Sequence, residues 1–516
     1  MIGAESLVRA LLHSGVEVCF ANPGTSEMHF LAALDRVPGM RCVLGLFEGV
    51  VTGAADGYGR MLDKPACTLL HLGPGLANGL SNLHNAMRAQ SPVVNIIGDH
   101  ATYHRRHDAP LTSDIEGTAR PFSHWVRTSE NAGSAAPDGV AAVAAALSAP
   151  GRIASLILPA DTAWNEVPDE PPPALPAISP RGRPDDAAID AAAKLLLSSE
   201  PTALVLAGQA TRAEALELAG KIAAKTGARL LAQTHTPRIA RGAGRVPVDR
   251  IPYPVDQALA LLSQFKNLIL IGGKAPVAFF AYPNKPSELS PPGARILPLA
   301  RVEQDALYTL QALAEAVKAT HVPVPACAYE ETPRPTGAIT PEKLGALLAA
   351  TLPEHAIVVD ESITTGRAFT PATRNTRPHD WLLGTGGSIG YAMPVSVGAA
   401  VACPDRKLVV LESDGSGLYM PQALWTQARQ GLNILTLIFA NRKYQILHNE
   451  MQNVGVHNVG PVAADLLDID RPSIDWVSLA KSFGVEAKRA ETMEELGRAI
   501  DAGMAMTGPC LIEVVL

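Results

Sequence analysis

Two polar residues in the last part of the chain stand where parallel strands would end. Asp414 follows the apolar run KLVVLES and precedes Gly415, Ser416 and Gly417. The next apolar run, NILTLIFA, ends at Asn441, 27 residues further on (441 − 414). That spacing suits one strand–helix–strand excursion, so we expect both side-chain oxygens at adjacent strand ends. Hard oxygen ligands of this kind favour Mg²⁺, whose coordination shell is usually completed by water and phosphate oxygens. Taken alone, Asp414 is equally typical of a helix cap or a turn.

One carboxylate in the first part of the chain lies in apolar surroundings. Glu48 interrupts the run LGLFEGVV, which we interpret as a strand that leads into a helix near Gly49. A carboxyl group at such a junction can hold or transfer a proton. The alternatives for an isolated buried Glu are a helix cap or a salt bridge.

These residues need a scaffold, and the sequence predicts alternating strands and helices. Short runs of β-branched residues and leucine alternate with amphipathic patterns, which is typical of βαβ units with parallel sheets. The expected strands are 42–48 (CVLGLFE), 66–72, 93–99 (VVNIIGD), 202–208, 228–234, 267–273, 356–360, 407–415, 433–441 and 510–516. Helices are expected from Ser6, near Gly49 and Leu76, and over 212–226, 388–402 and 421–430.

Two proline-rich stretches divide the chain. Residues 167–184 (VPDEPPPALPAISPRGRP) and 321–341 cannot continue a helix or a sheet, because proline removes backbone donors and restricts its neighbours. Three blocks remain: 1–165, a central block over 185–320, and 341–516. The fold class we predict is α/β, with a mainly parallel sheet flanked by helices in each of the three domains.

Composition excludes several classes of partner. Of the 516 residues, 47% are apolar and 18% are charged, and the net charge is −7, so no basic field attracts nucleic acid or anionic lipid. No apolar run reaches the ~18 residues of a membrane span. The six cysteines lie far apart, which fits a reducing compartment, and we expect a cytoplasmic protein with no nucleic acid or membrane partner.

The residues around Asp414 resemble the cofactor motif of thiamine diphosphate (ThDP) enzymes. The family pattern is G-D-G-S/A followed by N-N, and this chain reads SDGS and then AN, ending at Asn441. Ser413 replaces the first Gly and Ala440 the first Asn, and neither position carries the ligand in the family. The resemblance implies that Asp414, Asn441 and the main-chain carbonyl of Lys443 bind Mg²⁺.

Neighbouring segments extend this resemblance. The run GTGGSIGYAMP (384–394) is similar to the family's G-G-x-G-x-x-x-P, in which an apolar side chain supports the bend of the cofactor and a carbonyl accepts from its pyrimidine amino group. In this chain Ile389 matches the apolar side chain, and Gly387 matches the residue whose carbonyl accepts. The strand end DESITT (360–365) resembles the second diphosphate contact. The other cofactor contacts that the resemblance implies are Thr364, Gly415, Ser416 and Tyr444.

The first block resembles the activating half of the same family. Glu48 with ADGY at 55–58 matches the segment of the activating glutamate, and FANPGTSE (20–27) and LHLGPG (70–75) match two substrate loops. The overall likeness is to benzoylformate decarboxylases and acetolactate synthase large subunits, over nearly the whole chain. It implies that Glu48 hydrogen-bonds the pyrimidine nitrogen, Thr25 binds the substrate carboxylate and His71 moves protons. Because the two halves of the site come from two subunits in the family, it also implies a homodimer or homotetramer.

The expected function is that of a ThDP- and Mg²⁺-dependent enzyme on a small 2-oxo acid, which it decarboxylates before the enamine is protonated or carboligated. Ile446, Leu447 and Glu450, on the helix after Asn441, are expected to form the substrate wall. Benzoylformate decarboxylases carry a second histidine in the central block, but 274–282 (KAPVAFFAY) holds none. The central block shows only a weak phosphate signal, so we expect no FAD.

Three alternatives differ in class. A catalytically silent member of the fold would serve as a regulatory subunit, although intact Glu48, Asp414 and Asn441 speak against it. A lyase could act on an acyl-CoA donor instead. A nicotinamide or flavin oxidoreductase would need G-x-G-x-x-G after its first strand, and the chain offers only GPG at 73–75 without that context.

Overall fold

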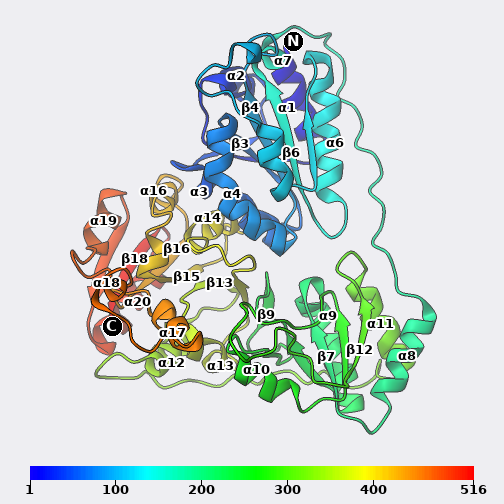
Figure 1. Ribbon diagram of the computed structural model, residues 1–516, viewed down its shortest axis with the longest axis vertical. Helices are drawn as coiled ribbons and strands as arrows, with labels where there is room; N and C mark the ends of the chain where they lie inside the picture. The colour runs from blue at the N-terminus through cyan, green and yellow to red at the C-terminus, as the bar shows by residue number, and fades with distance from the viewer.

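The computed structural model describes residues 1–516 and contains three sheets, all flanked by helices. Figure 1 shows the N-terminal unit (blue to cyan) above the central unit (green) and the C-terminal unit (yellow to red). The segment after α7 (Ala160–Trp164) runs as an extended chain to α8 (Asp186–Leu196), which opens the central unit. The predicted α/β fold of three mainly parallel sheets is confirmed.

The N-terminal sheet has six parallel strands, and the central sheet has five. The first has the order β2 (Arg41–Leu44), β1 (Val18–Ala21), β3 (Ala66–Leu70), β4 (Val93–Asp99), β6 (Ile153–Pro159) and β5 (Trp125–Thr128). The second has the order β10 (Asp249–Arg250), β8 (Arg229–Ala232), β7 (Thr202–Leu206), β11 (Asn267–Ile271) and β12 (Arg295–Ala300).

The C-terminal sheet has seven strands, one of which comes from the central block. Its order is β17 (Glu486–Ala490), β18 (Cys510–Val515), β16 (Ile434–Ala440), β15 (Leu408–Ser413), β13 (Ala356–Glu361), β14 (His379–Leu383) and β9 (Ile239–Arg241). All neighbours are parallel except β9 and β14, which pair antiparallel with Ala240 opposite Asp380. The central segment therefore caps one edge of the C-terminal sheet.

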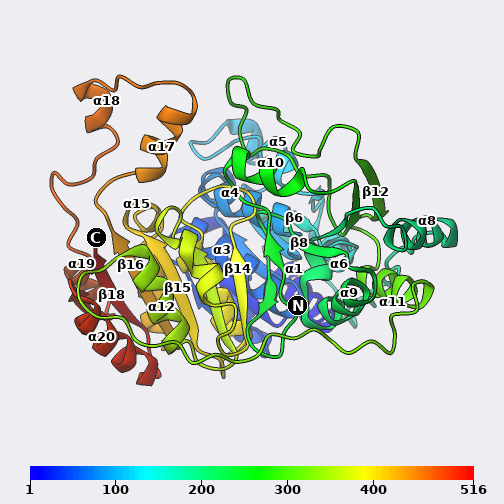
Figure 2. The same ribbon diagram turned by 90° about the horizontal axis from the view of Figure 1, so that it is seen from below.

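Helices cover both faces of each sheet. In the N-terminal unit they are α1 (Gly3–His13), α2 (Met28–Arg36), α3 (Glu48–Leu62), α4 (Leu72–Ala89), α5 (Ile115–Ala119), α6 (Ala135–Leu147) and α7. The central unit adds α8, α9 (Ala213–Thr226), α10 (Val255–Leu262) and α11 (Ala306–Ala316). The C-terminal unit has α12 (Pro341–Thr351), α13 (Phe369–Ala372), α14 (Ala392–Ala402), α15 (Asp414–Gly417), α16 (Ala423–Arg429), α17 (Gln445–Asn453), α18 (Pro461–Asp465), α19 (Trp476–Ser482) and α20 (Met493–Ala505). Figure 2 shows α17 and α18 extending beyond the C-terminal sheet.

Helices α3 and α14 join the N- and C-terminal units at very close range. A Cβ on Gly57 would lie 2.0 Å from the carbonyl oxygen of Val395, and one on Gly398 would lie 1.7 Å from that of Ala54. Only glycine lets the two backbones approach so closely. One apolar core continues through this junction, from Val50 of α3 to Val395 of α14.

Several predicted boundaries are wrong, and three of them lie beside the candidate site. The strand predicted over 407–415 ends at Ser413, and Asp414 begins α15. The strand predicted over 42–48 ends at Leu44, and Glu48 is the first residue of α3. The helix predicted from Ser388 begins at Ala392, because Gly387 and Gly390 adopt positive φ angles of 80° and 86°. A helix cannot include such residues, so 384–391 forms a loop at the end of β14.

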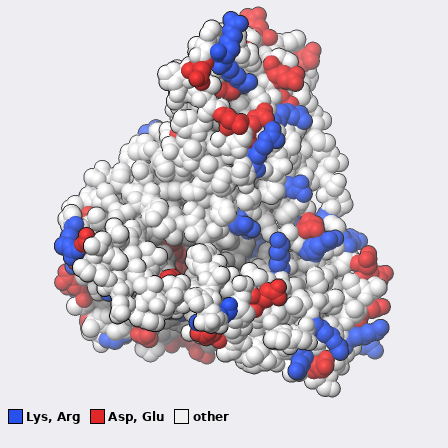
Figure 3. Space-filling view, viewed as in Figure 1, with Lys and Arg blue, Asp and Glu red and all other residues white.

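The surface is mixed in charge. Figure 3 shows blue and red side chains interspersed, with a broad uncharged area left of the centre of this face. All six cysteines are free thiols. None of the helices combines the length and apolar composition that a membrane span needs.

Candidate active site

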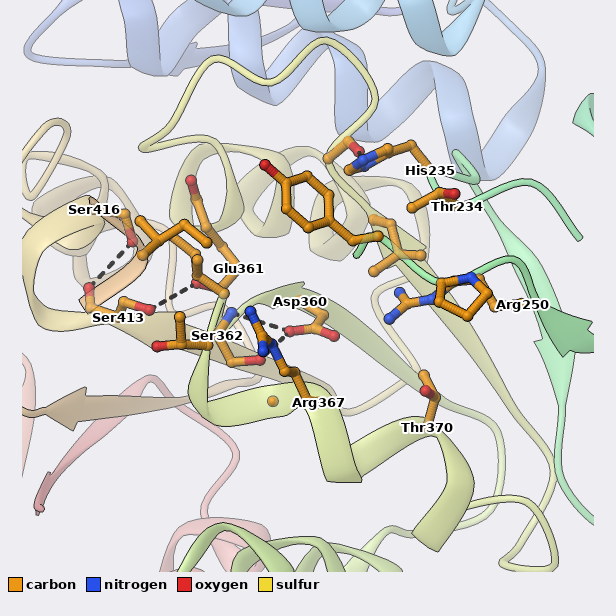
Figure 4. Close-up of a pocket in the computed structure, with 18 of the residues that line it drawn as sticks. Thr234, His235, Arg250, Asp360, Glu361, Ser362, Arg367, Thr370, Ser413 and Ser416 are labelled. Atoms are coloured by element: carbon orange, nitrogen blue, oxygen red, sulfur yellow. Dashed lines mark hydrogen bonds between the residues drawn. The ribbon is translucent and has the colours of Figure 1, made fainter. Parts of the chain in front are cut away.

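A cavity of about 890 Å³ lies where the carboxyl ends of β13 to β16 face loops of the central unit. Figure 4 shows Asp360, Glu361 and Ser413 contributing to its wall, with Thr234 and His235 on the side away from Thr370. Ligands of parallel sheets bind at such strand ends. The residues predicted to bind the diphosphate and metal or to form the substrate wall all line it: Thr364, Gly387, Ile389, Asp414, Gly415, Ser416, Asn441, Lys443, Tyr444, Ile446, Leu447 and Glu450.

The oxygen atoms at the ends of β15 and β16 can hold a divalent cation. Asp414 begins α15, and its two carboxylate oxygens accept from the backbone N–H of Gly415 (2.9 Å) and Arg442 (2.6 Å). Each oxygen has a further lone pair, so both remain available to a metal. Burial raises the pKa of Asp414 to about 6, which still leaves it mostly ionised at neutral pH. Asn441 follows β16 directly, and its Oδ1 accepts from the N–H of Lys443 (3.1 Å).

The backbone beside Asp414 leaves no room for side chains larger than glycine. A Cβ on Gly415 would lie 2.6 Å from Cε1 of Tyr444. The Tyr444 ring therefore covers the first turn of α15, where the N–H of Gly415 already donates to Asp414. Glycine at this position thus lets the ring lie directly against the backbone beside the predicted metal ligand.

The loop 384–391 is held from both sides. Two features require glycine at position 387. Its φ is positive, and a Cβ would lie 2.5 Å from Cζ of Phe279. From the N-terminal unit, Asn85 donates to the carbonyl of Ser388 (2.9 Å) and accepts from its N–H (3.2 Å). The loop is thus fixed before any ligand binds.

Two buried carboxyl groups under this loop were not among the predicted site residues. Glu361 accepts from the N–H groups of Gly390 (2.7 Å) and Ala392 (2.9 Å), and burial raises its pKa to about 8. Burial and then the charge of Glu361 raise the pKa of Glu412 well above its usual range, and Ser416 donates to it. Burial therefore favours the protonated form of each group. The sequence feature that could have identified them is an acidic residue at the end of each apolar strand, in DE at 360–361 and ES at 412–413.

A second cluster of predicted residues lies in the N-terminal unit. Glu48 accepts through Oε2 from Asn78 (3.0 Å), and Nδ1 of His71 lies 2.8 Å from Oε2 of Glu27. Gly75 separates the two groups, since its Cβ would lie 2.9 Å from Oε1 of Glu48 and 3.2 Å from Cβ of His71.

This cluster is separate from the cavity of its own chain. Thr25 begins the single 3₁₀ turn that ends at Glu27, next to His71. Burial raises the pKa of Glu27, and the imidazole of His71 partly offsets that effect. None of Thr25, His71 and Glu48 is among the residues that line the cavity. One chain therefore carries two separate groups of predicted residues, an acid and imidazole cluster and an oxygen-lined cavity.

Comparisons with known proteins agree on one family. The family model described as "Thiamine pyrophosphate enzyme, N-terminal TPP binding domain" matches residues 1–118. The model of the C-terminal TPP binding domain of the same family matches residues 364–514. The chain is 48% identical to the "Putative acetolactate synthase large subunit IlvX" of Mycobacterium tuberculosis, covering 100% of this chain and 99% of that protein. It is 30% identical to a benzoylformate decarboxylase of Pseudomonas aeruginosa, covering 98% and 97%. The solved structure of a Rhodococcus jostii thiamine diphosphate-dependent 4-hydroxybenzoylformate decarboxylase superposes with a TM-score of 0.86 at 26% identity, covering 99% and 98%.

Proposed function

The chain belongs to the thiamine pyrophosphate enzyme family, and from this premise we propose that it is a ThDP- and Mg²⁺-dependent enzyme that decarboxylates a small 2-oxo acid. The observation that carries the proposal is the convergence of the Asp414 and Asn441 oxygens and the preformed Gly387 loop on one cavity. When bound, the cofactor supplies a nucleophilic carbon for the keto group and a sink for the electron pair released with CO₂.

The metal is assigned to Asp414, Asn441 and the carbonyl of Lys443. The free lone pairs of the Asp414 carboxylate support this, because Mg²⁺ prefers oxygen ligands and shares them with phosphate. In the same proposal Thr364, Gly415, Ser416 and Tyr444 surround the diphosphate. The carbonyl of Gly387 accepts from the amino group of the pyrimidine, and Ile389 supports the bend between the two rings.

A second copy of the chain completes the site in this proposal. Thr25, His71 and Glu48 do not line the cavity of their own chain, and Oε1 of Glu48 has no hydrogen-bond partner within it. Glu48 of one protomer would hydrogen-bond the ring nitrogen of the cofactor held by the other. His71 would move protons and Thr25 would bind the substrate carboxylate. The smallest active assembly is then a homodimer, and two dimers make a homotetramer.

The substrate wall combines apolar and polar groups. Ile446, Leu447 and Glu450 of α17 face the central unit across the cavity, where the hydroxyl of Tyr253 lies 3.5 Å from Oε1 of Glu450. This wall selects the product formed after CO₂ loss: uptake of a proton gives an aldehyde, and addition to a second carbonyl compound gives a 2-hydroxy ketone or acetohydroxy acid. The six free thiols support the cytoplasm as its location.

The test is CO₂ release by dialysed protein from a panel of aliphatic and aromatic 2-oxo acids, with and without ThDP and Mg²⁺. Release that depends on both additions, with an aldehyde or 2-hydroxy ketone as product, is the expected result. ThDP binding without release from any acid would overturn the proposal in favour of a silent subunit or an acyl-CoA donor. Absorbance of the purified protein in the flavin region tests the expectation that the central unit holds no FAD.

A further inference from the structure

The cavity contains a histidine that neither the sequence patterns nor the proposed function uses. His235 lies just beyond the carboxyl end of β8, in the part of the cavity wall that the central unit provides. Figure 4 shows it entering the cavity beside Thr234. It lies far along the chain from the residues it meets, since Gly384 follows it by 149 residues.

The hydrogen bonding of His235 fixes its tautomer. Nδ1 lies 2.9 Å from the carbonyl oxygen of Gly384, and a carbonyl can only accept, so Nδ1 carries the proton. In the neutral ring Nε2 then holds a lone pair. Nε2 is buried and has no hydrogen-bond partner in the chain. A buried acceptor without a partner is costly, and in a cavity wall it indicates a missing ligand group.

Neighbouring rings and charges keep the imidazole in place and neutral. Its centroid lies 5.1 Å from that of Phe279, the ring that rests on Gly387, and 6.4 Å from that of Tyr253. Burial and then the charge of Arg250 lower the pKa of His235, while its bond to Gly384 opposes that shift. A carboxylate, Glu450, lies behind Tyr253, whose hydroxyl is 3.5 Å from Oε1 of Glu450. The loop predicted to hold the cofactor thus also orients the free lone pair.

We propose that His235 is a catalytic residue whose Nε2 exchanges a proton with the oxygen of the substrate's former keto group. This inference rests on the function proposed above. When the hydroxyl formed from that oxygen gives up its proton, the O–H bond breaks and an N–H bond forms at Nε2. The imidazolium keeps its Nδ1–H bond to Gly384 and later returns the same proton, so no electrons are transferred. The free base Nε2 is matched to this task because it is neutral at physiological pH.

His84 offers a matched control on the same loop. Its Nε2 lies 3.1 Å from the carbonyl oxygen of Gly386, so its proton is on Nε2, the opposite tautomer. It reaches the loop from α4, and it is not among the residues that line the cavity. The amide nitrogen of Asn matches the position of Nδ1, and that of Gln matches Nε2. H235N and H84Q therefore each retain the bond to the loop while removing the second ring nitrogen.

The experiment combines ¹⁵N NMR of histidine-labelled protein with kinetics. In the spectrum, an imidazole with a bare Nε2 should disappear in H235N but persist in H84Q. Lactate or mandelate, which carry a hydroxyl where the substrate has a keto group, should shift that Nε2 resonance in the ThDP–Mg²⁺-loaded protein. In turnover, H235N should lower kcat at least about 100-fold with unchanged ThDP affinity, whereas H84Q should stay within about twofold.

Two results would overturn the proposal. One is an Nε2 resonance that neither 2-hydroxy acid moves, and the other is a kcat of H235N equal to that of H84Q. If wild type releases no CO₂ from any 2-oxo acid, the proposed function fails, yet the resonance shift still decides whether Nε2 meets the hydroxyl group of a ligand. The two failures are therefore distinguishable.

Discussion

Replacing Arg60 with methionine should strongly destabilise the junction between the N- and C-terminal units. The guanidinium of Arg60 forms two parallel bonds to Asp56, from Nε to Oδ1 (2.9 Å) and from the terminal nitrogen to Oδ2 (2.6 Å). Both side chains are almost wholly buried. A further bond of 2.7 Å runs from Arg60 to the carbonyl of Leu383, the last residue of β14. Methionine fills much of the same space but leaves the Asp56 carboxylate without its counterion.

The expected magnitude depends on the contacts that remain. Breaking a buried ion pair from one side costs about 3–5 kcal/mol, because the surviving charge stays desolvated. Losing the donor to Leu383 adds about 1 kcal/mol, and the hydroxyl of Ser91, which still donates to Asp56, offsets a similar amount. R60M should therefore lose about 3–5 kcal/mol of unfolding free energy. In the double variant D56N/R60M the buried charge is gone, so the loss should fall below that of R60M alone.

The assay is urea unfolding of wild type, D56N, R60M and the double variant, followed by fluorescence and by hydrogen exchange over 379–391. Exchange in R60M should rise first in this segment, because Arg60 ties it to α3. A loss below about 1.5 kcal/mol in R60M would refute the reasoning, since it lies under the range for an uncompensated buried charge. So would a double variant at least as unstable as R60M.

Four further predictions concern the site and its surroundings. G387A should raise the ThDP concentration for half-maximal activity tenfold or more, because a Cβ meets the ring of Phe279. Adding F279A to G387A should recover part of the lost ThDP affinity, and an unchanged ThDP requirement in G387A would contradict this packing. D414A should raise the Mg²⁺ requirement at least about 100-fold in a metal titration, and an unaltered Mg²⁺ dependence would exclude it as a ligand. E48Q should keep ThDP affinity in calorimetry while kcat falls by about two orders of magnitude or more, and full turnover would remove its assigned role. Burial and the charge of Arg241 lower the pKa of His379 to about 4, so the neutral ring favours folding above pH 6.5 and this contribution is lost as pH falls from 6.5 towards 4. Wild type should lose about 2 kcal/mol more than H379N between pH 7.5 and 5 in urea unfolding, and equal losses would show that the ring titrates normally.

The sequence predicted the sheets best where strands are buried on both faces. VVNIIGD at 93–99 coincides with β4, and the helix expected over 212–226 is α9 (Ala213–Thr226), because apolar runs with clear ends leave few alternatives. Strand β9 was missed, since three residues in a polar setting carry no periodic signal. Its pairing depends on an edge that residues far along the chain provide.

The candidate site was predictable to the extent that it lies at strand ends. Asp414 and Asn441 could be placed near each other because parallel strands end at one edge of a sheet. His235 and Glu361 could not be assigned in the same way. His235 is notable for a ring nitrogen without a hydrogen-bond partner, and Glu361 for a raised pKa. Both properties arise only when distant segments of the chain meet. The predicted start of α14 at Ser388 was wrong for a related reason, since Glu361 accepts from the N–H of Gly390 and holds the loop before the helix.

The antiparallel edge formed by β9 also constrains the order of events during synthesis. Arg238, just before β9, pairs with Asp380 of β14, which follows it by 142 residues. At about 5–20 residues per second, roughly 7–28 s pass on the ribosome between the two. During that time β9 has left the ribosome with its backbone donors and acceptors open to any other strand. A nascent chain stalled before β14 would therefore be the species most prone to pair wrongly, and the central unit cannot finish folding until the C-terminal sheet exists.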